Sequence, residues 1–331
     1  MTISVIIPTI ENRNNIVLRT IEYYEKSNFE ILVADSSGFK NTSLINKKIK
    51  YLHLPDKSFF EKIEIALKQA SNKYVVLCQD DDFIVSESLN EGKNFLKNNS
   101  DYSAVHGDYI FFEKIFDKIF YELGYGDNSR KSFDANEFHE NYKRLISEGP
   151  QLVSALTTKD VLLENLSFLK NFEYIALYEL TMLIFMSMNG KIKYLNSIWQ
   201  LRDRHVHNKN AYKFGSKTNT INNFKLYLES HEGKLFTHSL YNLLKEKKNI
   251  NFQSFIEPLK IYSNNKTIKV DSEDSIKFKI KRLSPLLFKI LKKVNFIKRY
   301  LTLFFKPKKN YKNLNLKKNL IEIEEIIYKH S

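Results

Sequence analysis

Three continuous apolar runs, separated by stretches with helical spacing, most strongly constrain what the first eighty residues can fold into. The runs cover residues 3–8, 29–34 and 74–78. Each has the length and composition of a strand buried on both faces of a sheet. The stretch over residues 12–27 has helical spacing, and Ser58 and Glu61 are spaced like a capping box at a helix start. Strands joined by helical crossovers form a mainly parallel sheet with helices on both faces, so the expected fold class is α/β.

The other expected elements divide the chain in two. Further strands are expected at residues 51–54, 103–112, 118–123 and 192–195, and helices at 173–189 and from Asp134 onward. Gly190 stands where a C-terminal helix cap is expected. Beyond His207 the sequence is helical, rich in Asn and Lys, with few turn signals. We therefore expect one domain over residues 1–207 and a helical, Lys-rich region over residues 208–331.

Charge is distributed unevenly between these parts. The chain has 52 Lys and Arg against 38 Asp and Glu, a net charge of +14. Residues 1–205 hold 25 basic and 28 acidic side chains, net −3, and residues 206–331 hold 27 and 10, net +17. Between residues 275 and 321 there are fifteen Lys or Arg and no Asp or Glu. This asymmetry predicts that the last third contacts a polyanionic surface, either membrane or nucleic acid.

The sequence also indicates a cellular context. Cys78 is the only cysteine, which excludes an internal disulfide and a Cys-based zinc site. The apolar stretch at the start has no charged segment before it, unlike a signal peptide, and no apolar run reaches the ~20 residues that a spanning helix needs. We expect a protein of the reducing cytoplasm.

Acidic residues follow two of the expected strands. Asp35 ends the second strand, and Asp80, Asp81 and Asp82 follow the run at 74–78. In parallel sheets, ligands bind at the carboxyl ends of the strands. Asp80 and Asp82 have period-two spacing, so both carboxylates would face one side, where a divalent cation such as Mg²⁺ or Mn²⁺ would relieve their repulsion. The alternative is a solvated acidic turn.

These motifs resemble a known family. SVIIPT at the start, LVADSS after the second strand and VVLCQDDDFI around residue 80 resemble the GT-A nucleotide-sugar glycosyltransferases, and are most similar to the family-2-like bacterial enzymes of surface-polysaccharide synthesis. The resemblance covers about residues 1–205. It implies a Rossmann-like GT-A domain with a nucleotide-sugar half over about residues 1–112 and an acceptor half over about 113–207. The implied reaction moves a sugar from a nucleotide-diphosphate sugar, most commonly a UDP-sugar, to a glycan or lipid-linked acceptor.

The resemblance also implies roles for single residues. The positions that would contact the nucleotide-sugar are Pro8, Thr9, Glu11, Arg13, Asp35, Lys62, Asp80, Asp81 and Arg204. Asp35 would accept a hydrogen bond from the base, commonly uracil. Lys62 lies where the family often has an arginine that faces the donor.

A metal site is implied in the same way. Asp80 and Asp82 would form the D-x-D pair that binds Mn²⁺ or Mg²⁺ on the donor diphosphate, and His205 would be a further ligand. Many relatives read D-x-D-D, and aligning the last two acids places Gln79 first. Which two of the three aspartates bind metal therefore stays open.

A catalytic base is expected on the 173–189 helix. In inverting relatives it lies about a dozen residues before a glycine followed by a strand, and Glu179 has this spacing from Gly190. Glu179 would take the proton of the acceptor hydroxyl. Glu173 is the second choice, and the alternative is that Glu179 is a surface glutamate at a helix start.

Basic and imidazole side chains follow the last expected strand of the domain. Arg204 and His205, with His207 next, would clamp the diphosphate or add a metal ligand, or His205 would have a structural role at the domain boundary. Trp199 is either a packing residue or a stacking platform. His106 and Asp108 lie where acceptor-side residues lie in relatives.

The basic tail contains an amphipathic stripe. Apolar residues at alternating three- and four-residue steps predict a helix over about residues 283–305 with a cationic polar face. Such a helix suits an anionic membrane surface and would hold the protein at the inner face of the cytoplasmic membrane. The alternative is packing on the catalytic domain or on a second copy.

The sequence lacks features that other functions would require. A nucleotidyltransferase would have a Gly-rich loop after the first strand, whereas ENRNN contains no glycine. A nucleic-acid-binding protein would use the cationic tail, but the tail has no recognisable nucleic-acid motif. A non-catalytic binding protein is the remaining alternative, since acidic residues alone do not prove turnover.

Overall fold

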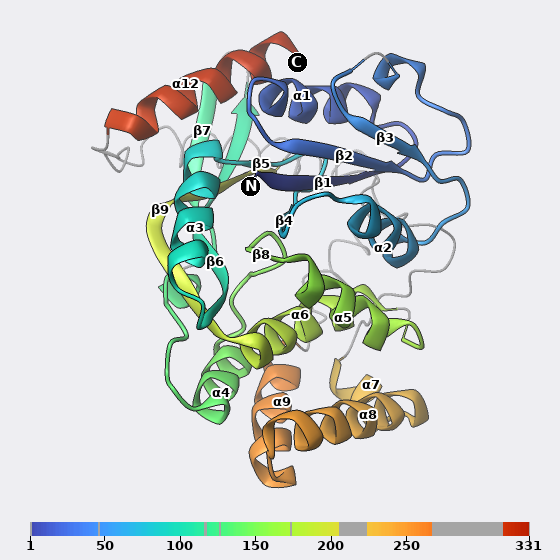
Figure 1. Cartoon of the computed structure of the whole chain (residues 1–331), viewed down its shortest axis with the longest axis vertical. Coiled ribbons are helices and arrows are strands. Elements are labelled where there is room, and N and C mark those ends of the chain that lie inside the picture. Colours follow the sequence, from blue (N-terminus) through green and yellow to red (C-terminus); the bar gives the residue numbers. More distant parts are fainter. Residues whose placement is uncertain are drawn as a thin grey trace, which may run out of the picture.

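The structure is a computed structural model that describes residues 2–45, 47–115, 118–125, 127–172, 174–204, 224–266 and 314–330 (Figure 1). Its centre is one sheet. In spatial order the strands are β3 (Lys50–His53), β2 (Glu30–Asp35), β1 (Ile3–Thr9), β4 (Tyr74–Leu77), β8 (Leu156–Thr158), β6 (Tyr102–Ile115), β9 (Lys191–Asp203) and β5 (Phe83–Ile84), and β7 (Lys118–Leu123) pairs with β6. Strands β1 to β4 are mutually parallel, as are β6 and β9, whereas β8, β5 and β7 run antiparallel to their neighbours.

Helices cover both faces of this sheet, as the sequence predicts. Along β1, Ile6 packs into one apolar cluster, and Val5 and Ile7 pack into another, because neighbouring strand residues point to opposite faces. The Ile6 side is covered by α2 (Phe59–Gln69), α4 (Phe138–Glu148), α5 (Lys159–Leu169) and α6 (Ile175–Asn189). The opposite side is covered by α1 (Asn14–Glu25) and α3 (Ser86–Asn98). The predicted α/β class is therefore confirmed.

Helix ends follow the sequence signals with one exception. Ser58 and Glu61 form the expected capping box at the start of α2, and Gly190 ends α6. The helix expected from Asp134 instead begins at Phe138. The side-chain amide of Asn141 bonds both the N–H and the C=O of Ala135, which holds this segment outside the helix.

Strand β9 is much longer than the expected strand at residues 192–195. It runs beside β6 with register shifts around Gly107. A Cβ at Gly107 would lie 2.6 Å from Ser197 O, so the two strands approach closely only because residue 107 has no side chain. Polar residues in the middle of β9 interrupt the apolar run and conceal its length.

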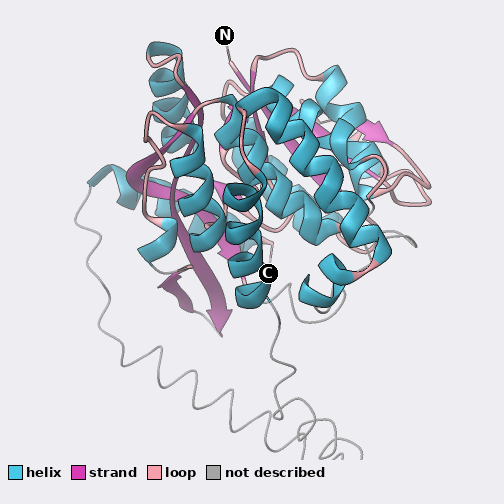
Figure 2. Cartoon of the chain, turned by 90° about the horizontal axis from the view of Figure 1, so that it is seen from below, coloured by secondary structure: helices cyan, strands magenta, loops and turns pink. Residues whose placement is uncertain are grey.

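Three helices after residue 223 share the core of the preceding domain. They are α7 (Phe224–Glu229), α8 (His231–Lys248) and α9 (Phe252–Lys266). Phe236 of α8 packs edge-on against Phe172 at 5.2 Å, and Tyr142 Oη of α4 donates to Phe255 O of α9 at 2.8 Å. Figure 2 shows this layer of helices in front of the strands.

The last helix, α12 (Leu314–Lys329), returns to the other face of the sheet and lies beside α1 (Figure 1). Its buried side chains are Ile323, Ile326 and Ile327. Lys329 Nζ and His330 Nε2 both contact the Glu22 carboxylate at 2.7 Å.

The amphipathic helix predicted over residues 283–305 lies outside the described residues. No helix within the described ranges is long and apolar enough to cross a membrane.

Candidate active site

A tight turn after β4 carries the three consecutive aspartates. The Asp82 N–H donates to Gln79 O at 3.1 Å, which closes the turn. Gln79 Oε1 accepts from Ser154 Oγ and from Gln200 Nε2, both at 3.0 Å. The turn is therefore tied to the loop before β8 and to β9.

Helix α1 fixes the backbone of the same turn. Thr20 Oγ1 donates to Asp80 O, and Arg19 Nη2 donates to Asp81 O, each at 2.7 Å. Arg19 Nη1 also pairs with Asp203 Oδ2 at 2.8 Å. These contacts connect the helix that follows β1 to the ends of β4 and β9.

Arg13 spans the first two aspartates. Its Nε donates to Asp80 Oδ2 at 2.7 Å and its Nη2 to Asp80 Oδ1 at 2.5 Å, while Nη2 lies 3.1 Å from Asp81 Oδ2. Thr9 Oγ1, at the end of β1, donates to Asp80 Oδ2 at 2.7 Å. Burial raises the pKa of Asp80 above its usual value, and the Arg13 guanidinium opposes this rise.

Asp82 has a separate set of partners. Its carboxylate accepts from Gln200 Nε2 at 2.7 Å and from the Asp203 N–H at 3.2 Å, and lies 3.2 Å from Arg202 Nε. The side chain is fully buried, and burial raises its pKa well above the usual value. Asp80 and Asp82 therefore do not face a common partner as period-two spacing predicts, because β4 ends at Leu77 and the aspartates lie in a turn.

Lys62 lies between the ends of β1 and β2. This α2 residue is buried, and its Nζ donates to Thr9 O at 2.6 Å and to Ser36 Oγ at 3.0 Å. Burial lowers the pKa of Lys62 to about 8, although the nearby carboxylates of Asp80 and Asp35 favour its charged form.

Asp35 ends β2 beside these groups. Its Oδ1 accepts from the Ser37 N–H at 2.9 Å, and its Oδ2 accepts from Tyr51 Oη of β3 at 2.6 Å. In the parallel ladder Thr9 pairs with Asp35 and Pro8 with Ala34, so β1 and β2 end together. The loops that follow them are joined by the Gly38 N–H, which donates to Glu11 Oε1 at 2.5 Å. The structure thus brings the predicted positions on β1, β2, α2 and the aspartate turn to one edge of the sheet.

Arg202 contacts the aspartate turn, and the sequence analysis did not single it out. Besides Asp82, Arg202 contacts the Tyr125 hydroxyl. The predicted Arg204 instead pairs with Glu122 at 2.7 Å and lies over the Phe111 ring at 4.5 Å. The two arginines are two residues apart at the end of β9, so the sequence pattern alone does not distinguish which of them contacts the aspartate turn.

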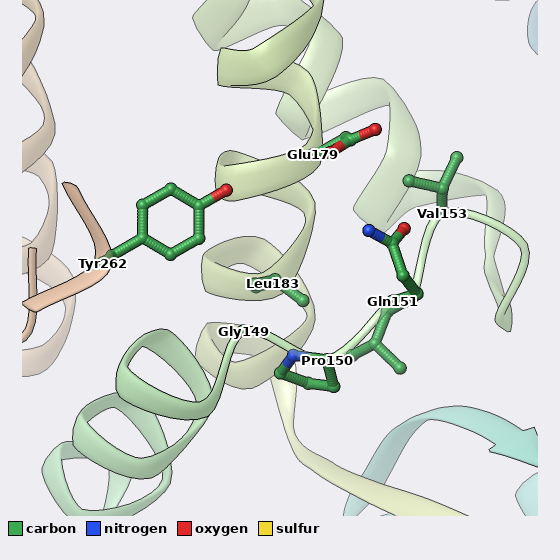
Figure 3. A pocket seen from close by; sticks show the side chains of 8 residues that line it. Gly149, Pro150, Gln151, Val153, Glu179, Leu183 and Tyr262 are labelled. Atoms are coloured by element: carbon green, nitrogen blue, oxygen red, sulfur yellow. The ribbon is translucent and has the colours of Figure 1, made fainter. Parts of the chain in front are cut away.

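Glu179 lies in the second turn of α6 and lines a pocket. The pocket is formed by Gly149, Pro150, Gln151, Leu152, Val153, Glu179, Leu183 and Tyr262 (Figure 3). Burial raises the pKa of Tyr125, which Arg202 opposes, and the charges of Asp82 and Glu179 both add to the rise. Glu179 and the aspartate turn therefore act electrostatically on the same tyrosine.

Three other predicted residues are held by the core. The Trp199 ring is fully buried and its Nε1 donates to Ser154 O at 2.7 Å, which makes it a packing residue. His106 is fully buried with Nε2 3.2 Å from Lys131 O, and burial lowers its pKa to about 4. Asp108 pairs with Arg130 at 2.9 Å.

Part of the predicted site cannot be placed. Glu173, His205 and His207 lie outside the described residues. Among the residues that are described, no three His, Cys, Asp or Glu side chains form a cluster that would bind a metal.

Comparison with known families assigns the segment that carries these residues. Residues 4–149, from β1 to the end of α4, match the family model described as glycosyl transferase family 2. Over this segment the chain is similar to family 2 glycosyltransferases. The matched segment contains Thr9, Arg13, Asp35, Lys62 and the three aspartates, whereas Glu179 and Arg202 lie beyond it. The match confirms the glycosyltransferase identification made from the motifs.

Solved structures show the same fold. The S. aureus TarS structure aligns with 85% of this chain at a TM-score of 0.54 and 14% identity, and the chain spans 46% of that protein. S. aureus TarS 1–349 in complex with UDP-GlcNAc aligns with 83% of this chain and 78% of its own length, at a TM-score of 0.54 and 15% identity. The structure of S. aureus TarS 1–349 in complex with UDP aligns at a TM-score of 0.53 and 16% identity. These matches confirm the GT-A fold. No curated protein sequence matches the chain significantly.

Proposed function

We propose that this chain transfers a sugar from a UDP-sugar to a hydroxyl group of a glycan or lipid-linked acceptor in surface-polysaccharide synthesis. The observation that carries the proposal is the convergence of Asp35, Lys62, Arg13 and Asp80 at the carboxyl ends of β1, β2 and β4 in the segment similar to family 2 glycosyltransferases. The TarS structures with UDP and UDP-GlcNAc, which share the fold, support a uridine nucleotide as the donor.

The nucleotide would lie along this edge of the sheet. Asp35 is held by Tyr51 and the Ser37 N–H, and its carboxylate would accept an N–H from the uracil ring. Lys62 and Arg13 lie at the same edge of the sheet, and they would neutralise the diphosphate. A carboxylate for the base and cations for the phosphates are the groups that a UDP-sugar requires.

Mn²⁺ or Mg²⁺ is proposed as the cofactor. The donor chemistry fits at Asp80 and Asp81, because both carboxylates are buried and a cationic guanidinium nitrogen already bridges them. Asp80 would hold the ion, with Asp81 or, after a change of its partners, Asp82; His205 is the further candidate. The ion would supply positive charge to the departing diphosphate.

Glu179 is proposed as the base of an inverting transfer. The acceptor oxygen would form a bond to the anomeric carbon, the bond from that carbon to the diphosphate would break, and the acceptor proton would pass to Glu179. The diphosphate would leave with the bonding electron pair. Arg202, which contacts the aspartate turn, would balance the charge of the leaving group, the role expected for Arg204 from the sequence.

The chain is further proposed to act at the inner face of the cytoplasmic membrane. Residues 206–331 carry a net charge of +17, and an anionic leaflet attracts each Lys or Arg at its surface by ~1 kcal/mol. A lipid-linked acceptor would be encountered at the same surface.

Release of UDP from UDP-GlcNAc, with water taking the place of the acceptor hydroxyl, tests this function. In MnCl₂ the wild type is expected to release UDP, and Glu179→Gln is expected to do so about a hundredfold more slowly with an unchanged Kd for UDP. Glu164→Gln, at a partly exposed glutamate of α5, is the matched control and should behave as the wild type. If Glu179→Gln releases UDP as fast as the wild type, Glu179 is not the base. If the wild type releases UDP at full rate in EDTA, the reaction does not need a metal ion.

A further inference from the structure

Strand β3 brings two polar side chains to the edge of the sheet where Asp35 lies. β3 is at one end of the strand order, beside β2, and Asp35 pairs with His53 in the parallel ladder (Figure 1). Residues that pair across strands, and residues two apart on one strand, point to the same face of a sheet. Tyr51 and His53 therefore lie on the same face as Asp35, where they meet the loop that follows β2.

The Tyr51 hydroxyl joins the Asp35 carboxylate to this loop. Tyr51 Oη donates to Asp35 Oδ2 at 2.6 Å and accepts from the Asn41 N–H at 2.8 Å. Burial and the neighbouring Asp35 carboxylate raise the pKa of Tyr51, so the hydroxyl keeps its proton. The Tyr51 ring packs against the apolar cluster on the α1 side of the sheet and stacks on His53 at 6.4 Å. The hydroxyl is thus held in place with its one proton directed at Asp35.

His53 holds the same loop at a second point. Its Nε2 lies 2.9 Å from Ser37 O, and because a carbonyl oxygen only accepts, the ring is the donor of this hydrogen bond. Ser37 in turn donates its N–H to Asp35 Oδ1 at 2.9 Å and its hydroxyl to the same oxygen at 2.5 Å. The Asp35 side chain is buried, so these donors set its orientation.

A count of hydrogen bonds shows what Asp35 can still accept. A carboxylate has about four acceptor positions, two on each oxygen. Within the part of the chain that the structure describes, the two Ser37 donors fill Oδ1, and the Tyr51 hydroxyl takes one position on Oδ2. The other position on Oδ2 is left for a ligand. A single N–H suits it, and uracil has one at N3, whereas cytosine would direct a lone pair from N3 at the carboxylate.

We propose that Tyr51 is the positioning residue through which Asp35 selects uracil over cytosine. This inference rests on the proposed function, since it takes Asp35 as the residue that contacts the base. With the Tyr51 hydroxyl in place, Asp35 presents one acceptor position in a fixed direction. Without this hydroxyl, Oδ2 has two free positions and the Asn41 N–H loses its acceptor, so the direction of the carboxylate is no longer fixed.

Calorimetry with UDP and CDP tests the proposal. The two nucleotides share the ribose and the diphosphate, so CDP reports the contacts outside the base. The wild-type full chain in MgCl₂ is expected to bind UDP about thirtyfold more tightly than CDP. Tyr51→Phe, which keeps the ring, should bind UDP about tenfold more weakly and CDP within about twofold of the wild type, so the preference narrows to about threefold.

Two further comparisons separate positioning from a general structural effect. In the Asp35→Asn background, Tyr51→Phe should weaken UDP binding no further, because its effect passes through the carboxylate. Tyr121→Phe is the matched control, since Tyr121 Oη of β7 also donates to a carboxylate, Glu324 Oε1 of α12 at 2.8 Å. This variant should bind both nucleotides as the wild type does.

The outcomes also separate this inference from the proposed function. The inference is overturned if the wild type binds CDP as tightly as UDP, if Tyr51→Phe keeps the wild-type preference, or if Tyr51→Phe weakens UDP binding equally in both backgrounds. In these cases the nucleotide site still stands, provided that the wild type binds UDP more tightly than Asp35→Asn does. If the wild type does not bind UDP, or binds it no better than Asp35→Asn, the proposed base contact fails and the role of Tyr51 fails with it.

Discussion

The Arg13 guanidinium donates two hydrogen bonds to the Asp80 carboxylate, from Nε at 2.7 Å and from Nη2 at 2.5 Å. Charge-assisted pairs of this kind are stronger than neutral hydrogen bonds. A donor diphosphate would attract the guanidinium, and a metal ion would require the carboxylate. A bound metal ion and a bound diphosphate would therefore each change the pairing of Arg13 with Asp80.

Removal of Arg13 should change metal and nucleotide binding in opposite directions. Arg13→Gln leaves Asp80 and Asp81 without a guanidinium, so Mn²⁺ should bind the nucleotide-free protein about tenfold more tightly, while UDP should bind about tenfold more weakly. Free Mn²⁺ measured by EPR and calorimetry with UDP report the two affinities. Arg130→Gln removes a guanidinium that pairs with Asp108 and should change neither. Unchanged Mn²⁺ affinity in Arg13→Gln would contradict this account.

UDP binding should weaken as the pH rises through the pKa of Lys62. That pKa is lowered to about 8 by burial, and the charges of Asp80, Asp35, Glu11 and Arg13 also act on the amine. The diphosphate favours the protonated amine, which is lost above the pKa, so the affinity should fall about fivefold between pH 7 and pH 9.5. Calorimetry in buffers of matched ionic strength measures this change. Lys62→Met should bind weakly with no dependence on pH in this range; the same slope in this variant would assign the titration to another group.

The ion pair between Arg19 and Asp203 should contribute strongly to stability. Both side chains are buried, and the Arg19 guanidinium also lies over the rings of Phe83 and Phe112. Breaking a buried pair costs roughly 3–5 kcal/mol, so Arg19→Met should lower the free energy of unfolding by that amount in urea denaturation. The exposed pair of Lys26 with Glu322 is the comparison, and Lys26→Met should cost less than ~1 kcal/mol. Similar losses in both variants would show that burial does not determine the value of the pair.

Helix α12 should be an integral part of the fold. Ile323 is fully buried against the face of the sheet that α1 covers, whereas Ile321 of the same helix is 46% exposed. Ile323→Ala should therefore cost about 2–5 kcal/mol in the free energy of unfolding, and Ile321→Ala less than ~0.5 kcal/mol. Thermal and urea unfolding of the full chain measure both. Equal effects would mean that α12 does not pack on this face.

The apolar runs of the first eighty residues predicted β1, β2 and β4 to within a residue or two, because strands buried on both faces have no polar interruptions. Strand β8 is three residues long and β5 two, too short for a recognisable pattern. The long β9 was missed because polar residues break its apolar character.

The sequence predicted which residues lie at the candidate site better than it predicted how their side chains pair. Thr9, Lys62, Asp35 and Asp80 lie together because parallel strands end at one edge of the sheet. The separation of Asp82 from Asp80 depends on a turn whose hydrogen bonds involve α1 and β9, which are distant in sequence. The contacts of Arg202 and Tyr262 likewise depend on tertiary packing, and no local motif marks them.

Calorimetric titration of UDP into the wild type and Asp35→Asn tests the central claim that this edge of the sheet binds a uridine nucleotide. Asp160→Asn, at an exposed aspartate of α5, is the control. The account predicts that UDP binds the wild type and the control equally, and Asp35→Asn at least about tenfold more weakly, because the base loses a charged acceptor. Equal affinities in all three proteins, or no binding of UDP by the wild type, would contradict it.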